Sequence, residues 1–127
     1  MSSSSVKPLV WIGSSLKDLR EFPDEVKDEM GFALFEAQCG LKPTSAKPLR
    51  GFGGAGVLEV VSDCQSDTFQ AVYTVRLEDC VYVLHAFQKK SGKGAATPKA
   101  DIEMIKRRLR QAEELHSEWR QELEGEV

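Results

Sequence analysis

Residues 73–91 place two alternating apolar segments on either side of a short acidic turn, a pattern that predicts a β-hairpin. The turn, Glu78–Asp79, allows only antiparallel neighbours, because parallel strands need a crossover of roughly a dozen or more residues. In the second strand, alternate residues share a face: Val81, Val83, His85 and Phe87 form one set, and Tyr82, Leu84 and Ala86 form the other. We expect one set to pack into a core and the other to be available for binding.

The second strand runs directly into a basic segment. Lys89, Lys90 and Lys93 follow it, interleaved with serine and glycine. Such a loop lets the backbone approach a polyanion while the ammonium groups neutralise phosphates. The segment favours RNA as the first partner to consider, although lysines that only keep a strand end soluble would give the same pattern.

Charge is unevenly distributed along the 127-residue chain, whose formal net charge is −3. Residues 85–110 hold eight Lys or Arg against two acidic residues, whereas residues 111–127 hold six Glu against one Arg. A basic surface beside an acidic tail suits a protein that binds an anion at one site and another protein elsewhere. A helix with a solvated, charged outer face would produce the same counts.

Length and cysteine usage predict a single domain, residues 1–127, in a reducing cytoplasm. The three cysteines, Cys39, Cys64 and Cys80, contain no CxxC pair and indicate neither a disulfide framework nor a zinc site. The two histidines lack paired ligand spacing, so we expect no metal and no cofactor. We expect no signal peptide, no membrane span, and disorder over residues 1–7.

The remaining pattern predicts an α+β fold in the order β-α-α-β-β-β-α, with a small antiparallel sheet. The expected elements are a strand at 9–12, helices at 16–22 and 23–40, a loop at 41–56, strands at 57–61, 69–76 and 80–87, and a helix from 97. The second helix has the apolar stripe Val26, Met30, Ala33, Leu34 and Ala37, and the last helix has Ile102, Ile105, Leu109, Ala112 and Leu115.

The last helix continues into an acidic tail, residues 113–127. Leu115, Trp119 and Leu123 recur there at a spacing of four and form an apolar stripe beyond the expected core. This stripe could contact a partner protein or a second copy of the chain, or the helix could fold back on its own core.

Five blocks resemble the phage-derived branch of the RelE/HigB toxin family when they occur in this order. They read PLRGFG from Pro48, VLEV from Val57, AVYTVR from Ala71, VLHAFQKKS from Val83, and TPKADIE from Thr97. The LHAFxKK part is the most specific. The resemblance covers roughly residues 8–115 and implies a RelE-like toxin of a toxin–antitoxin pair. Such a toxin cleaves mRNA during translation without a metal and is silenced by a helix-turn-helix antitoxin encoded beside it.

In this chemistry the 2′-hydroxyl attacks the adjacent phosphate, which requires a proton acceptor, cations at the phosphate, and an acid for the leaving oxygen. His85 is the candidate for proton transfer because its ordinary pKa lies near neutrality. The other candidate catalytic residues are Lys89, Lys90 and Arg76, and the candidate RNA-binding residues are Lys47, Arg50, Phe87, Lys93 and Gln70.

The chain departs from the family pattern at two places. Gln70 stands where the family commonly has a phosphate-binding arginine, and no tyrosine follows Tyr82 at the position of a catalytic tyrosine. These departures favour a second hypothesis, a non-catalytic interaction module that regulates a partner protein. Other roles also stay open: His85 could be a strand residue bonded to a carbonyl, Glu59 a base or a counter-ion, and Tyr73 a packing residue.

Overall fold

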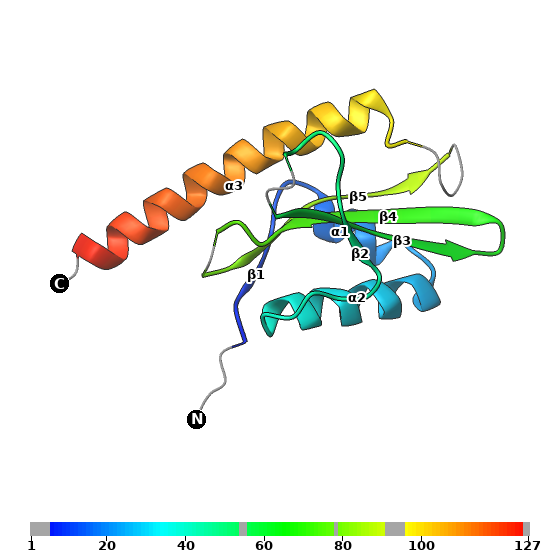
Figure 1. Ribbon diagram of the computed structural model, residues 1–127, viewed down its shortest axis with the longest axis horizontal. Coiled ribbons are helices and arrows are strands. Elements are labelled where there is room, and N and C mark those ends of the chain that lie inside the picture. The colour runs from blue at the N-terminus through cyan, green and yellow to red at the C-terminus, as the bar shows by residue number, and fades with distance from the viewer. Residues whose placement is uncertain (1–5, 54–55, 78, 91–95, 126–127) are drawn as a thin grey trace.

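The computed structural model describes residues 6–53, 56–77, 79–90 and 96–125 (Figure 1). The elements are β1 (Leu9–Trp11), α1 (Ser15–Arg20), α2 (Asp24–Gln38), β2 (Ala46–Pro48), β3 (Val57–Cys64), β4 (Asp67–Thr74), β5 (Val81–Lys89) and α3 (Lys99–Gly125). The strands form one five-stranded sheet in the order β1-β5-β4-β3-β2. The predicted α+β class is confirmed, and the arrangement is consistent with a small RelE-like fold.

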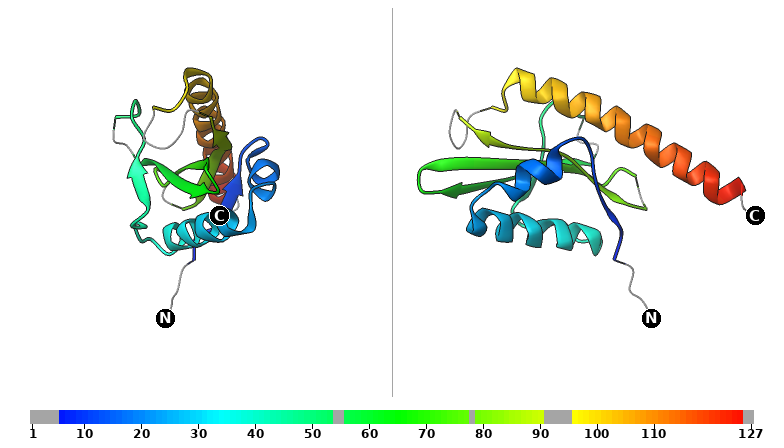
Figure 2. Two further views of the ribbon diagram at one scale, coloured as in Figure 1. Left: turned by 90° about the vertical axis from the view of Figure 1, so that its right-hand side faces the viewer. Right: turned by 180° about the vertical axis from the view of Figure 1, so that it is seen from behind.

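The helices form layers on the two faces of the sheet. Figures 1 and 2 show α2 on one face and α3 on the other, with α1 beside the edge of the sheet where β1 and β5 lie. We call these the α2 face and the α3 face. The α2 stripe predicted from the sequence is entirely buried and packs on side chains of β3, β4 and β5. Tyr73 belongs to this core, and burial raises its pKa to about 12, so Tyr73 is a neutral packing residue.

Two features of the sheet were not predicted. The segment expected to be a loop contains β2, whose Lys47 pairs with Glu59 in an antiparallel register. Three residues that include Lys and Pro carry no alternating apolar signal, which is why the pattern did not indicate a strand. In addition, β1 pairs with β5 in parallel, although an antiparallel sheet was expected. Two helices and three strands separate β1 from β5 along the chain, which leaves ample length for the crossover that a parallel pair needs.

A β-bulge in β5 corrects the predicted alternation of side chains. Val72 pairs with His85 and Tyr73 pairs with Val83, so Leu84 is an extra residue in the register. The bulge shifts the alternation by one position: Ala86 joins Val83 in the core on the α2 face, while Leu84 packs into the second core. His85 therefore does not share a face with Val83, as the simple alternation predicted, and its ring points to α3.

The second core lies between the sheet and the first half of α3. Ile105, Leu109 and Ala112 are buried in it, and Ile102 is partly buried. Leu115, predicted to be the last member of this stripe, is 49% exposed. The buried stripe continues instead at His116, which is 8% exposed and bonded to Tyr82 of β5, so Leu115 lies on the neighbouring side of α3, away from the sheet.

The two ends of the chain are described only in part. The Lys7 backbone N–H donates to the Gln38 carbonyl oxygen at 2.9 Å, so this residue of the segment expected to be disordered is bonded to the end of α2. Residues 1–5 lie outside the described part. Among the described helices, none is long and apolar enough to cross a membrane.

Candidate functional site

Polar side chains gather on the α3 face at the end of the sheet where β5 finishes. The strand register places Lys47, Glu59, Val72 and His85 in one row across four strands, Val61, Gln70 and Phe87 in the next, and Asp63, Thr68 and Lys89 in the third. Residues paired in register point to the same face of a sheet. We call Lys47, Glu59, Gln70, His85, Phe87 and Lys89 the polar face.

His85 forms the border of the polar face and is bonded to two side chains of α3. Its Nε2 lies 2.7 Å from Asp101 Oδ1, and its Nδ1 lies 3.3 Å from Arg108 Nη1. Phe87 stacks on the imidazole with ring centroids 4.8 Å apart and an interplanar angle of 21°. The ring is thus fixed from three sides, and His85 as a whole is 8% exposed.

These contacts determine which nitrogen carries the proton. Arginine has no acceptor, so Arg108 donates to Nδ1, and Nε2–H then donates to the Asp101 carboxylate. A neutral imidazole in this tautomer has no lone pair free to take a proton from a 2′-hydroxyl. Nor can it act as an acid, since loss of the Nε2 proton would leave an imidazolate. In the observed arrangement His85 orients its neighbours.

Arg108 connects α3 to β5 and to the start of α1. Besides His85, its guanidinium donates to the Leu84 carbonyl oxygen at 3.0 Å and to Ser14 Oγ at 3.2 Å. Gly13 has φ +58°, and a Cβ there would lie 2.8 Å from the guanidinium carbon. Only glycine accommodates both the positive φ and the close approach. Burial lowers the pKa of Arg108, an effect that Asp18 partly offsets.

Glu59 is the half-buried carboxyl at the centre of the polar face. Burial raises its pKa, while the charges of Lys89 and Lys47 act in the opposite direction. Lys89 itself is only 5% exposed, which is unusual for a lysine at the end of a strand. A carboxyl with a raised pKa that interacts electrostatically with a buried lysine on the same face is an arrangement suited to proton transfer. Two strand spacings, roughly 10 Å, separate Glu59 from His85.

Gln70 is fully buried, although the sequence suggested a residue available to RNA. Its Nε2 donates to Thr97 Oγ1 at 3.1 Å and so joins β4 to the segment that leads into α3. Its Oε1 is buried and has no hydrogen-bond partner among the described residues. The amide therefore holds the two elements together and leaves one acceptor unsatisfied.

The predicted cations do not all converge on one point. Arg76 and Arg50 follow the strand ends at which Val57 pairs with Thr74, whereas Lys89 pairs with Thr68 at the other end. Six residues of β3 separate these ends, which is roughly 20 Å. Arg76 also forms an ion pair with Glu113 at 3.7 Å. Lys89 and Arg76 therefore cannot contact the same phosphate.

The remaining predicted residues lie at or near the polar face. Lys47 is exposed on β2, next to Glu59, and Phe87 is half-buried on β5. Lys90 is exposed directly after β5. Lys93 lies outside the described residues, as does most of the basic loop.

The sequence pattern did not predict the two α3 residues that are bonded to His85, Asp101 and Arg108. Asp101 and Arg108 were counted only as part of a charged surface. A signal was available: both fall on the inner stripe of α3, seven residues apart and in step with Ile105. A charged residue within an apolar stripe needs a buried partner.

The described residues contain no group of three or more His, Cys, Asp or Glu side chains arranged to hold a metal ion. Searches among curated proteins and among solved structures found no match to the chain. Residues 17–110 match the family described as "Phage derived protein Gp49-like (DUF891)". The match includes most of α1, the first part of α3 up to residue 110, and every residue of the polar face. The chain therefore belongs to the Gp49-like family of phage-derived proteins.

Proposed function

We propose that this protein is the RelE/HigB-like toxin of a toxin–antitoxin pair and that it cleaves mRNA as a metal-free endoribonuclease. The observation that carries the proposal is Glu59, a carboxyl whose pKa is raised by burial, between the lysines of an otherwise polar sheet face. The resemblance of the LHAFxKK block supports the same activity. Membership of the Gp49-like family is compatible with it.

Glu59 is our candidate for the general base. Its carboxylate takes the proton from a 2′-hydroxyl, and the 2′-oxygen forms a bond to phosphorus. A raised pKa makes this carboxylate a stronger base than an ordinary exposed glutamate. The bond between phosphorus and the 5′-oxygen then breaks, leaving a 2′,3′-cyclic phosphate on one fragment.

Lys89 is our candidate for the cation at the reacting phosphate and for the acid. Its ammonium stabilises the charge that develops on the phosphoryl oxygens and donates a proton to the leaving 5′-oxygen, which becomes a 5′-hydroxyl. Because Lys89 is 5% exposed, its charge acts in a poorly hydrated environment, where electrostatic stabilisation is strong. Lys47 and Lys90 would then bind flanking phosphates.

His85 and Phe87 are assigned a positioning role in place of the proton transfer predicted for His85. Asp101 and Arg108 hold the imidazole, and Phe87 stacks on it. The partly exposed phenyl ring provides a platform on which an unstacked base of single-stranded RNA can lie.

A non-catalytic interaction module is the second candidate function. Gln70 favours it, because the fully buried amide supplies neither a charge nor an accessible donor where the resemblance implies a phosphate-binding arginine. Replacing a cation at the reacting phosphate by a neutral group costs about 2.7 to 4 kcal/mol of transition-state stabilisation. A module of this kind would bind its partner and leave RNA intact.

The proposed partner is a helix-turn-helix antitoxin encoded beside this chain. The acidic half of α3 is our candidate for the surface that it contacts first. Leu115, Trp119 and Leu123 are 49%, 38% and 46% exposed and lie on one stripe of this helix. Glutamates flank the stripe, so a partner with an apolar and basic surface would complement it. Pairing of two copies through this stripe is the alternative.

Expression with end mapping tests the proposed activity. The chain is expressed from a tightly controlled promoter as wild type, Glu59→Gln and Glu103→Gln, and cellular RNA with 5′-hydroxyl ends is sequenced while growth is followed. Glu103 is an exposed acid on α3 and serves as the matched control. We expect arrest and new ends within coding regions for wild type and the control, and neither for Glu59→Gln.

The opposite results discriminate the two candidate functions. Growth without new ends in wild type would favour the interaction module. New ends that persist in Glu59→Gln would leave a nuclease but remove Glu59 as its base.

A further inference from the structure

One half of β5 has an unpaired edge. β4 pairs with β5 along its whole length, but β1 pairs only with Val81–Val83. Beyond Val83, no described residue continues the sheet on that side. An unpaired edge presents backbone N–H and C=O groups that can accept another strand.

A groove lies beside this edge, between β5 and the end of α1. It has a volume of ≈ 400 Å³, and Phe22, Phe69 and Phe87 provide its apolar lining. Phe22 and Phe69 pack together with ring centroids 4.8 Å apart. Figure 2 shows α1 beside the β5 edge of the sheet and apart from α3, so the groove is separate from the polar face except where His85 and Phe87 border both.

Two carboxylates determine what this groove can bind. Asp18 and Glu21 line it. Asp18 accepts a hydrogen bond from Ser14, whereas the exposed Glu21 carboxylate has no hydrogen-bond or ion-pair partner among the described residues. Carboxylates repel phosphate and attract ammonium or guanidinium groups. The negative charge of Asp18 and Glu21 therefore disfavours RNA as the ligand of the groove and favours a basic side chain of a protein.

We propose that an extended segment of a partner protein adds to the free edge of β5 as a further strand and places a lysine or arginine against Asp18 and Glu21. Strand addition supplies backbone hydrogen bonds, and the groove beside the edge supplies side-chain specificity. The proposal rests on the proposed function in one respect: the partner is taken to be the helix-turn-helix protein encoded beside the chain.

A strand bound at the β5 edge would affect the polar face, because His85 and Phe87 belong both to the polar face and to the groove beside the edge. His85 and Phe87 line the groove, and their stacked rings are the proposed platform for a base. A strand bound along β5 fixes the backbone that carries them. If it holds Phe87 away from RNA, partner binding weakens RNA binding, and RNA weakens partner binding by the same factor.

Hydrogen exchange on the full chain tests the proposal, with the neighbouring helix-turn-helix protein as the probe. The two proteins are co-expressed and purified, and amide exchange is compared with that of the chain alone. We expect slower exchange over residues 84–89 in the complex. We also expect Glu21→Lys to weaken the partner's affinity about tenfold or more.

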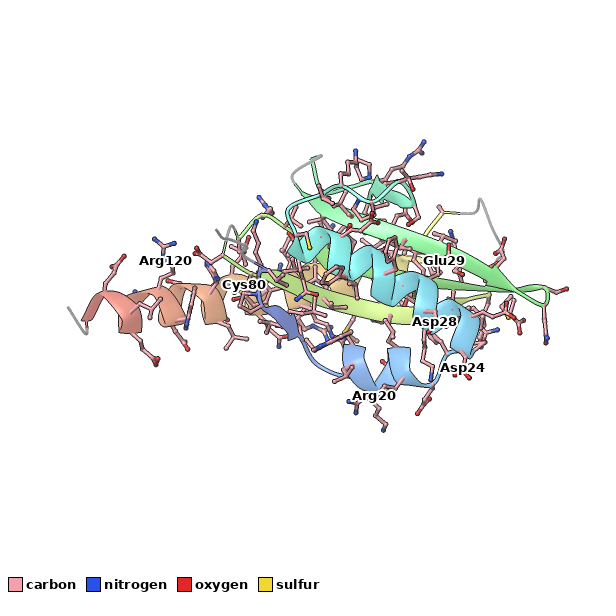
Figure 3. All side chains as sticks on the ribbon, turned by 90° about the horizontal axis from the view of Figure 1, so that it is seen from below. Arg20, Asp24, Asp28, Glu29, Cys80 and Arg120 are labelled. Carbon is pink, nitrogen blue, oxygen red and sulfur yellow. The ribbon has the colours of Figure 1, made fainter. Side chains whose placement is uncertain are left out.

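The matched control is Asp28→Lys, which reverses an exposed acid on α2 outside the groove (Figure 3). It should leave the affinity within about twofold. The same preparations are assayed for RNA cleavage, so that loss of activity and loss of partner binding are scored separately.

Three results would overturn the strand-addition proposal while leaving the nuclease proposal intact: protection confined to residues 113–125, equal effects of the two charge reversals, or no complex with the neighbouring protein while RNA is still cleaved. Protection at residues 84–89 without any RNA cleavage would support strand addition and count against the nuclease.

Discussion

The two histidines of this chain are equally buried, at 8% exposure, and both lie between the sheet and α3. His85 lies under its first half and His116 on its second. Each is bonded to an aspartate and packs against an aromatic ring. His85 is bonded to Asp101 and stacked on Phe87, whereas His116 is bonded to Asp79 and tilted against Trp119. Burial and hydrogen bonding alone therefore do not distinguish a functional histidine from a structural one.

The surroundings of the two residues differ. His116 Nδ1 lies 2.9 Å from the Tyr82 hydroxyl, and Asp79 joins it to Arg120. The hydrogen bond from Arg120 lowers the pKa of Asp79, and burial raises the pKa of Tyr82 to about 12. This cluster attaches the projecting half of α3 to the β4–β5 connection, and Arg120 lies far along that half in Figure 3. The cation of this cluster, Arg120, is already paired with Asp79.

The surroundings of His85 include groups that remain available for chemistry. Glu59 and Lys89 lie on the same face and interact electrostatically, without a hydrogen bond that would occupy either of them among the described residues. A proposed active site here depends on this pair, and the histidine supports it. Titratable groups on the same face that lack a hydrogen-bond partner therefore indicate function better than the buried histidine itself does.

The largest expected effect comes from two adjacent lysines that differ in burial. Lys89→Met should lower the cleavage rate by about 10² to 10³, as expected for the loss of one preorganised donor at the reacting phosphate. Lys90→Met should lower it less than about tenfold, because Lys90 is exposed and its charge is screened. Single-turnover cleavage of a defined mRNA by the purified proteins measures both.

Circular dichroism of both variants provides the control for folding. Equal losses of cleavage rate in the two variants would mean that the buried position of Lys89 confers no special role on it. Lys89 would then no longer be the candidate for the general acid.

A smaller effect is expected on folding stability, where the arginines beside the two histidines should differ. Arg108→Met should lower the free energy of unfolding by about 1 to 3 kcal/mol, because it leaves the buried Leu84 carbonyl and His85 Nδ1 without their donor. Arg120→Met should have a much smaller effect, since its ion pair with Asp79 is exposed. Urea denaturation of the two variants checks this order, and a larger loss for Arg120→Met would contradict it.

Much of the fold could be predicted from periodicity. The stripe of α2 was identified residue by residue, because a continuous amphipathic helix that packs on one sheet gives a regular signal. The bulge at Leu84 could not be foreseen, since an inserted residue leaves no mark in a run where both faces of the strand are buried. Its consequence was large, because it decides on which face His85 lies.

The candidate site was predictable in composition but less so in geometry. Lys89 and His85 were identified from the basic cluster that follows the hairpin. Their partners came from a distant helix: Asp101 and Arg108 reach β5 only after the chain has folded, and charge counting along the sequence treated them as surface. Glu59 was recognised as a possible base or counter-ion, and only its neighbours across the sheet favour one role.

The pH dependence of RNA cleavage shows whether Glu59 acts as the general base. Because burial raises the pKa of Glu59 above its ordinary value, its base form is lost at a higher pH than for an exposed glutamate. We expect the single-turnover cleavage rate of the purified protein to rise about tenfold per pH unit as the pH increases toward the pKa of Glu59, and to level off above that pKa. We also expect Glu59→Gln to abolish this acidic limb together with most of the activity. An unchanged acidic limb in Glu59→Gln, or cleavage at the wild-type rate, would contradict the claim that this carboxylate is the base.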